Sequence, residues 1–112
     1  MASDCLFCRI IAGDIPAQRV YEDQHMVVFK DIHPKAAVHL LAVPRKHIAS
    51  LIELGPEHDG LVGHMLRQLP AIAREQGLHH GFRTVINTGP GGGQEVFHLH
   101  IHLLGGGRLP GF

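Results

Sequence analysis

The stretch Val96-Phe97-His98-Leu99-His100-Ile101-His102-Leu103-Leu104 alternates between histidine and large apolar side chains. Successive side chains of a β-strand point to opposite faces of a sheet. We therefore expect one strand over 96–104, with the three imidazoles on one face at intervals of about 6.6 Å. The other face would carry Phe97, Leu99, Ile101 and Leu103 and would anchor the strand to the core.

Histidines on a shared face can bind a metal, bind phosphate, or act as nucleophile and acid–base near neutral pH. The segment directly before them, Asn87 to Gln94, is rich in glycine. Glycines let a ligand approach the backbone, and successive amide N–H groups can form an anion site. A flexible hairpin connection has a similar composition, and the Lys-Ser/Thr ending of a P-loop is missing. The direct join to the histidines favours a phosphate-binding loop.

Hydrophobic periodicity and turn residues predict the remaining elements around this stretch. A short helix is expected at Cys5–Ala12 and a long helix at Glu57–Gln76, interrupted and kinked at Pro70. Four further strands are expected at Arg19–Glu22, Met26–Lys30, Val38–Pro44 and Phe82–Asn87. These elements predict an α+β fold in one domain over residues 1–112, with a five-stranded antiparallel sheet, one long helix and one short helix.

The composition excludes several classes of protein. The chain has 112 residues, 45% of them hydrophobic, and a formal net charge of zero, which fits one compact domain. No run of Lys or Arg marks a nucleic-acid surface. The first residues lack the features of a secretory signal, and no apolar run approaches the length of a membrane span. We expect a cytoplasmic protein with neither nucleic acid nor membrane as its partner.

The two cysteines, Cys5 and Cys8, form a C-x-x-C pattern. In a reducing compartment this pattern indicates metal binding or redox chemistry more than a structural disulfide. Two thiolates at this spacing can supply half of a tetrahedral zinc site. A pair of buried, unliganded thiols is the alternative interpretation.

The string His98-Leu-His100-Ile-His102-Leu-Leu resembles the signature of the histidine triad (HIT) superfamily, in which histidines alternate with apolar residues. Further matches are Asp31 with Ile32 and Pro34, His39, the segment Pro44-Arg45-Lys46-His47, and Asn87 before Gly92-Gly93-Gln94. The similarity runs from about Cys5 to Gly107 and is strongest to the nucleotide-binding branch, the purine nucleoside phosphoramidases. This resemblance implies a HIT-like fold.

The resemblance also implies covalent catalysis by the triad, with no organic cofactor. His100 would attack the α-phosphorus of a purine nucleoside phosphoramidate, and water would hydrolyse the nucleotidyl-histidine. His102 would bond the phosphate and stabilise its charge, and His39 would orient the triad or relay a proton. His98 is the first member of this catalytic set.

A purine nucleoside monophosphate or phosphoramidate is therefore the expected small-molecule partner. Asp31 would accept hydrogen bonds from both ribose hydroxyls. The expected base contacts are Phe7, Ile10, Phe29 and Ile32, each of which could also be an ordinary core residue. The expected phosphate contacts are Asn87, Gly93, Gln94, Glu95, Val96, His100 and His102.

For the cysteine pair the resemblance implies a structural zinc held by Cys5, Cys8, His47 and His98. A closed set of four protein ligands leaves no open position for catalysis. His98 would then serve the metal and leave the phosphate to His100 and His102. The resemblance also implies a homodimer, paired through the long helix and the strand Phe82–Asn87.

Two departures from the family pattern leave the choice of leaving group open. Glu95 stands where animal members have a serine associated with protonation of the leaving amine, and an ionised carboxylate near phosphate is unfavourable. The tail after Gly107 is short and contains no tryptophan. Two alternatives remain: a dinucleoside polyphosphate hydrolase of the sister branch, and a non-catalytic module that binds purine nucleotide or zinc.

Overall fold

The computed structural model describes residues 4–112 and contains one sheet of five strands. The strands are β1 (Arg19–Glu22), β2 (Met26–Lys30), β3 (Val38–Pro44), β4 (Arg83–Val85) and β5 (Ile101–Gly105). The helices are α1 (Leu6–Ile11) and α2 (Asp59–Glu75), with short 3-10 turns at Leu51–Glu53, Pro56–His58 and Pro90–Gly92. The strand order is β1-β2-β3-β5-β4, and all neighbours are antiparallel. The predicted α+β fold is confirmed.

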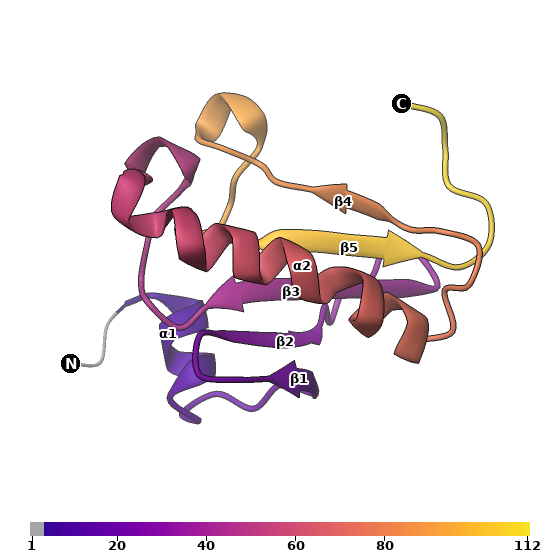
Figure 1. The fold of residues 1–112 in the computed structure, drawn as a ribbon, viewed down its shortest axis with the longest axis horizontal. Coiled ribbons are helices and arrows are strands. Elements are labelled where there is room, and N and C mark those ends of the chain that lie inside the picture. The colour runs from indigo at the N-terminus through magenta and orange to yellow at the C-terminus, as the bar shows by residue number, and fades with distance from the viewer. Residues whose placement is uncertain (1–3) are drawn as a thin grey trace.

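The sheet separates two apolar layers, because alternate residues of each strand reach opposite faces. Figure 1 shows α2 lying across one face. On this face the strands contribute Met26, Val28, Leu40, Ala42, Ile101 and Leu103, which cluster with Met65, Leu69, Ile72 and Ala73 of α2. On the opposite face Val27, Phe29, Leu41 and Val43 cluster with Phe7 and Ile10 of α1. Among residues 4–112, no helix is long and apolar enough to cross a membrane.

The histidine stretch forms a strand only in its second half, so the prediction of a strand over 96–104 is wrong for residues 96–100. β3 pairs with β5 up to Ala42 opposite Ile101, and the next steps of this register would bring Pro44 opposite Leu99. Pro44 has no N–H to donate to a ladder, and its carbonyl accepts a hydrogen bond from the His98 ring at 2.8 Å. Leu99, Ile101 and Leu103 are buried as predicted, whereas Phe97 is 47% exposed instead of lying in the core.

The long helix continues through Pro70, so this residue does not interrupt it as predicted. Pro70 removes the N–H that would bond the carbonyl of Leu66. Both residues are exposed on α2, where water can satisfy that carbonyl. The helix begins two residues later than predicted, at Asp59, because Pro56–His58 forms a separate 3-10 turn before it.

Candidate active site

A hollow of about 600 Å³ lies on the face of the sheet that carries α1. We call it the main hollow. Its walls include the predicted base and ribose residues Phe7, Ile10, Phe29, Asp31 and Ile32, and the predicted phosphate residues Asn87, Gly93, Glu95, Val96, His100 and His102. His39 also lines it. Segments far apart in the sequence thus bring most of the predicted site residues to one cavity.

Gln94 does not line the main hollow, because its side chain is buried in the loop instead. Its Oε1 accepts from the Gly89 amide at 2.8 Å, and its Nε2 donates to the carbonyls of Ala49 and Val96 at 2.8 and 3.0 Å. Gln94 therefore holds the shape of the glycine loop.

The loop amides are only partly available for an anion. The N–H groups of Gly93 and Gln94 donate to the carbonyls of Pro90 and Gly89, which closes the turns of the loop. The N–H groups of Glu95 and Val96 donate to no other residue within 4–112. The anion-binding amides predicted over 93–96 are therefore reduced to the last two. The Asn87 amide also uses one of its hydrogens, which it donates to the Gly92 carbonyl at 2.8 Å.

The His100 ring is oriented by a main-chain carbonyl. Its Nδ1 lies 2.8 Å from the carbonyl oxygen of His98, which can only accept, so Nδ1 carries the hydrogen. Burial lowers the pKa of His100, outweighing the His98 carbonyl and the Asp31 carboxylate, which favour the charged form. The ring is therefore neutral at pH 7, and its Nε2 has a free electron pair. The Phe7 ring packs edge-on against it at 5.0 Å between centroids.

His39 and His102 form a second oriented pair. The amide of Lys35 donates to His39 Nδ1 at 3.0 Å, so the hydrogen of this neutral ring sits on Nε2. That Nε2 lies 2.9 Å from His102 Nδ1 and donates to it. Burial, with the neighbouring His100 and His39, lowers the pKa of His102 to about 4. The neutral His102 ring therefore carries its own hydrogen on Nε2, as a donor.

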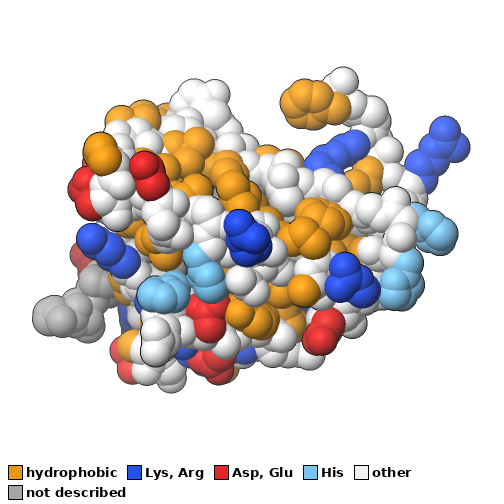
Figure 2. Space-filling view, viewed as in Figure 1, with side chains coloured by type: hydrophobic (Ala, Val, Ile, Leu, Met, Phe, Trp, Pro, Cys, Tyr) orange, Lys and Arg blue, Asp and Glu red, His pale blue; other side chains and the backbone are white. Residues whose placement is uncertain are grey.

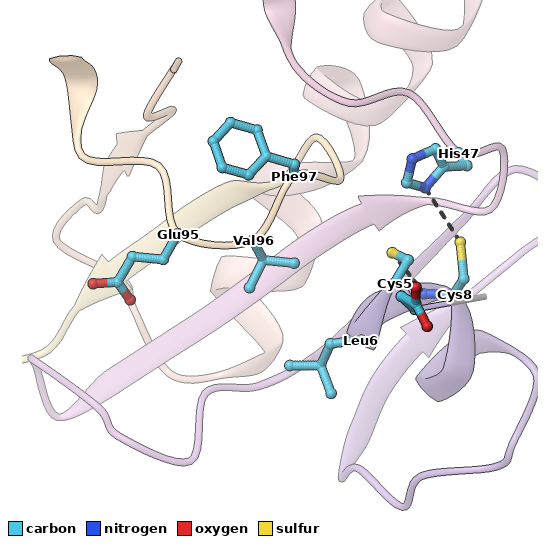
Figure 3. Close-up of a pocket in the computed structure, with 8 residues that line it drawn as sticks. Cys5, Leu6, Cys8, His47, Glu95, Val96 and Phe97 are labelled. Atoms are coloured by element: carbon cyan, nitrogen blue, oxygen red, sulfur yellow. Dashed lines mark hydrogen bonds between the residues drawn. The ribbon is translucent and has the colours of Figure 1, made fainter. Parts of the chain in front are cut away.

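A separate set of side chains, which we call the thiol cluster, brings together Cys5, Cys8, His47 and His98, whose ligand atoms all lie within 4.8 Å of one another. The His98 Nδ1 lies 3.3 Å from Cys5 Sγ, 3.5 Å from Cys8 Sγ and 3.2 Å from His47 Nδ1. Figure 3 shows Cys8 directed toward His47, where the sulfur lies 3.3 Å from Nδ1.

The chemistry of this donor set fits a metal ion. The His98 Nε2 donates its hydrogen to the Pro44 carbonyl at 2.8 Å, which leaves the Nδ1 electron pair facing the sulfurs. Two thiolates and two imidazoles are a common ligand set for a four-coordinate ion. The thiol cluster can therefore hold a metal. His98 does not line the main hollow. Its ring lies in the thiol cluster, and its main-chain carbonyl accepts a hydrogen bond from the His100 ring.

Asp31, His39 and His102 also lie close enough to share an ion. However, His39 already uses Nδ1 to accept from the Lys35 amide, so binding an ion through Nε2 would require an imidazolate. This group is better described as a hydrogen-bonded chain. The Asp31 carboxylate lies 3.5 Å from His39 Nε2, and Asp31 also lines the main hollow.

Several functional contacts were not predicted from the sequence. The Lys35 amide and the carbonyls of Pro44 and His98 orient the rings, but main-chain atoms are the same at every residue and leave no sequence signal. Arg19 was also missed: its guanidinium donates to the carbonyls of Ile10 and Ile11 at 2.8 and 3.1 Å and holds the end of α1.

Known proteins are similar to this chain over most of its length. Residues 4–108 match the family model described as "Scavenger mRNA decapping enzyme C-term binding". The chain is 58% identical over 102 residues to the protein HitA of Neisseria gonorrhoeae, covering 91% of this chain and 95% of HitA. It is 53% identical over 109 residues to an uncharacterized HIT-like protein of Synechococcus elongatus, covering 97% and 96% of the two chains.

Solved structures match over the same range. A HIT family hydrolase from Legionella pneumophila superposes with a TM-score of 0.90 at 45% identity, covering 95% of each chain. A histidine triad protein from Clostridium difficile superposes with a TM-score of 0.94 at 43% identity, covering 100% of this chain and 98% of that one.

Proposed function

This chain belongs to the histidine triad (HIT) family, whose solved relatives include hydrolases, and on that premise we propose that it hydrolyses purine nucleoside phosphoramidates. The observation that carries the proposal is the pair of ring assignments in the main hollow. His100 offers an electron pair on Nε2, while His102 beside it offers a hydrogen on Nε2. A nucleophile next to a donor is what attack on a phosphorus centre needs.

In the first step, His100 Nε2 forms a bond to the α-phosphorus, and the bond from phosphorus to the amine nitrogen breaks. The departing nitrogen keeps the electron pair, takes a proton from water and leaves as an amine. His102 Nε2 and the free amides of Glu95 and Val96 would bond the phosphate oxygens as charge builds on them. The ring hydrogen of His100 stays on Nδ1, where the His98 carbonyl stabilises the positive ring of the intermediate.

In the second step, a water oxygen bonds to phosphorus and the bond to Nε2 breaks, which returns the electron pair to His100. The water gives up its proton to solvent, so the sum of both steps is phosphoramidate plus water giving nucleoside monophosphate plus amine. His39 acts as a positioning residue here, because its Nε2 hydrogen holds His102 in the tautomer that donates to phosphate.

The nucleoside would occupy the apolar part of the main hollow. Phe29 and Ile10 form buried apolar walls, and the exposed Ile32 can cover the base from the rim. The Asp31 carboxylate offers two acceptor oxygens, which suits the two ribose hydroxyls. A base of purine size fits a cavity of this volume.

The metal of the thiol cluster would be zinc. Four ligands from Cys5, Cys8, His47 and His98 complete a tetrahedral set, so the metal would be structural. It would tie α1 to the segment before β5. His98 would connect the metal site to the active site, because its ring would be a metal ligand and its carbonyl orients the His100 ring.

Replacing His100 by alanine tests the proposed reaction. We expect His100→Ala to abolish hydrolysis of an adenosine phosphoramidate while the affinity for AMP stays within about tenfold, because the base and ribose walls remain. Turnover by fluorescence or mass spectrometry and binding by calorimetry give the two measurements. Undiminished turnover in this variant would refute covalent catalysis at His100. Trapping a nucleotidyl adduct on His100 during turnover would exclude a non-catalytic nucleotide-binding module.

A second candidate function is hydrolysis of dinucleoside polyphosphates. Lys30 and Lys35 lie on the wall of the main hollow, and their ammonium groups favour a substrate that carries more phosphate charge than a phosphoramidate. Competition between an adenosine phosphoramidate and a diadenosine polyphosphate in one assay separates the two functions. A higher kcat/KM for the polyphosphate would favour this second candidate.

A further inference from the structure

The part of the main hollow proposed for the base has apolar walls from two different elements. Phe7 and Ile10 come from α1, and Phe29 comes from β2. We call the part of the main hollow lined by these three residues the base slot. The rings of Phe7 and Phe29 meet edge-to-face, with 5.5 Å between their centroids. Because one element supplies each wall, the placement of α1 relative to β2 determines the shape of the base slot.

The last turn of α1 is held by a side chain from outside the helix. α1 has six residues, so its last carbonyls need donors beyond the helix itself. The Nη2 of Arg19 donates to the carbonyls of Ile10 and Ile11 at 2.8 and 3.1 Å. A guanidinium also suits the negative end of the helix dipole. Arg19 therefore fixes the turn of α1 that carries Ile10 into the base slot.

The main chain of Arg19 lies beside the other wall of the base slot. Arg19 is the first residue of β1, and its partner in the pairing of β1 with β2 is Phe29. The neighbouring amide of Lys30 donates to the carbonyl of Gln18 at 3.0 Å, which ties the two chains together at this point. Arg19 thus connects the two walls, because its main chain pairs with β2 and its side chain holds α1.

A carboxylate and a second arginine keep the Arg19 guanidinium in this direction. Glu22 Oε1 accepts from Arg19 Nη1 at 2.9 Å and from Arg45 Nη2 at 2.9 Å. Arg45 also donates through Nε to the carbonyl of Asp23 at 2.8 Å, which fixes its own position. The planar guanidinium of Arg19 can serve Glu22 and the helix carbonyls at once, whereas the ammonium of a lysine lacks this fork geometry.

We propose that Arg19 is a positioning residue that sets the shape of the base slot and thereby the affinity for the base. This inference rests on the proposed binding of a nucleotide in the main hollow and adds a residue that determines its specificity. Arg19 does not line the main hollow, so it acts through α1. The rings of His100 and His102 are oriented by other groups, so the chemical step should not depend on Arg19.

A ligand with a base and a ligand without one test this inference. AMP and ribose 5-phosphate share the ribose and the phosphate, but only AMP reaches the base slot. We expect Arg19→Ala to weaken AMP binding about tenfold and ribose 5-phosphate binding by less than about twofold, because a displaced wall loses apolar contact with the base alone. NMR titration measures both affinities. Equal weakening of the two ligands, or of neither, would overturn the inference.

The matched control is Arg9→Ala, which removes a guanidinium from α1 itself. Arg9 is exposed and does not line the main hollow, and its side chain makes no hydrogen bond or ion pair with residues 4–112. Both affinities should equal those of the wild-type protein. A loss of AMP affinity in this control as large as that in Arg19→Ala would overturn the inference, because loss of charge on α1 would then explain both.

Two milder variants keep the test decisive if Arg19→Ala does not fold. Arg19→Lys keeps the charge and one donor, so it should recover part of the AMP affinity. Glu22→Gln removes the carboxylate that orients Arg19, and it should cause a smaller loss that again spares ribose 5-phosphate. Unchanged AMP affinity in both variants would overturn the inference.

Turnover gives an independent measurement. In Arg19→Ala, KM for an adenosine phosphoramidate should rise about tenfold while kcat stays within about twofold, because base binding is lost and the triad is kept. A fall in kcat at unchanged KM would overturn the inference. If the wild-type protein binds AMP but hydrolyses no phosphoramidate, the proposed reaction fails, while the affinities for AMP and ribose 5-phosphate still decide the role of Arg19.

Discussion

His98, His100 and His102 have the same side chain but different hydrogen-bonding states. The hydrogen lies on Nε2 of His98, on Nδ1 of His100 and on Nε2 of His102. The rings of His98 and His100 each face a carbonyl, which can only accept a hydrogen bond. The His102 ring instead accepts a hydrogen bond from His39, whose own orientation is fixed by the Lys35 amide. The free nitrogen of each histidine therefore follows from its neighbours in space, and this determines which ring suits attack, donation or metal binding.

The low pKa of His102 leads to a prediction about stability. Its folded pKa of about 4 lies below the ordinary value of 6.5, so the unfolded chain binds more protons between these two values. The contribution of His102 to the free energy of unfolding is therefore fully present above about pH 6.5, and it is lost as the pH drops toward 4. The charged or titratable groups around His102 are His39, His100, Asp31 and Lys35.

Unfolding by urea at pH 7 and at about pH 5 checks this prediction. The free energy of unfolding should fall by on the order of 1–2 kcal/mol more in the wild-type protein than in His102→Gln, which cannot titrate there. Both proteins keep the thiol cluster, so its own pH dependence cancels in the comparison. Identical losses in the two proteins would contradict the assignment of a neutral His102.

At this scale, residue types were easier to predict than their roles. The histidine pattern and the family resemblance together named most residues on the walls of the main hollow. Gln94 was expected at the phosphate, but it is buried under the loop. A side chain's identity does not reveal whether it faces the cavity or the loop beneath it, because that depends on the path of the main chain.

Among the elements, α1 is a helix of six residues, and the segment 96–100 lies outside the sheet. Side-chain contacts therefore matter for holding both of them in place. The Arg19 guanidinium holds the end of α1, and the thiol cluster joins its beginning to His98. α1 carries Phe7 and Ile10 into the main hollow. Losing the thiol cluster would therefore disturb both the base wall and the carbonyl that orients His100.

Metal analysis and thermal unfolding test this connection. Protein purified without added zinc should contain close to one equivalent per chain, and the double variant Cys5→Ser, Cys8→Ser should contain none. We expect the variant to lose on the order of several kcal/mol of stability, because metal binding contributes to folding. Wild-type protein treated with a chelator should match it, which controls for the substitutions themselves. Absence of metal from the wild-type protein would contradict a zinc site.

Element positions were predicted well where side-chain periodicity is strong. β1, β2 and β3 have the predicted bounds, since a buried strand alternates or is apolar throughout. The start of β5 was missed because the alternating pattern continues through 96–100 although the ladder with β3 ends at Ile101, and the Leu99 N–H donates to the Ile48 carbonyl instead. Such a break depends on Pro44 across the sheet, which a pattern within one segment cannot show.

At the scale of the whole molecule, the sheet ends in two edge strands, β1 and β4. Within residues 4–112, β4 pairs only with β5 and is three residues long. Figure 2 views the face that carries α2 and shows hydrophobic side chains gathered there. Leu66 on α2 and Phe82 next to β4 are 47% and 37% exposed. Exposed edges and apolar surface of this kind are usually covered by a partner.

We propose that a second copy of the chain covers this surface in a two-fold dimer. Sedimentation or light scattering should give twice the chain mass of 12.3 kDa. Leu66→Arg should shift the protein to the mass of one chain, because a charge would be buried in the contact. Leu6→Arg is the matched control, since Leu6 has similar exposure on the opposite side of the sheet. A wild-type protein with the mass of one chain would exclude the dimer.

The hydrogen bond from His98 to the Pro44 carbonyl also has an evolutionary consequence. Every amino acid supplies a carbonyl, so selection acting through this bond, and through the His98 carbonyl on His100, preserves the course of the chain and not the identity of particular residues. Neighbouring side chains can drift while both bonds survive. A lineage could even lose Cys5 and Cys8 and keep its reaction, provided that other contacts still hold residues 96–100 in the same path.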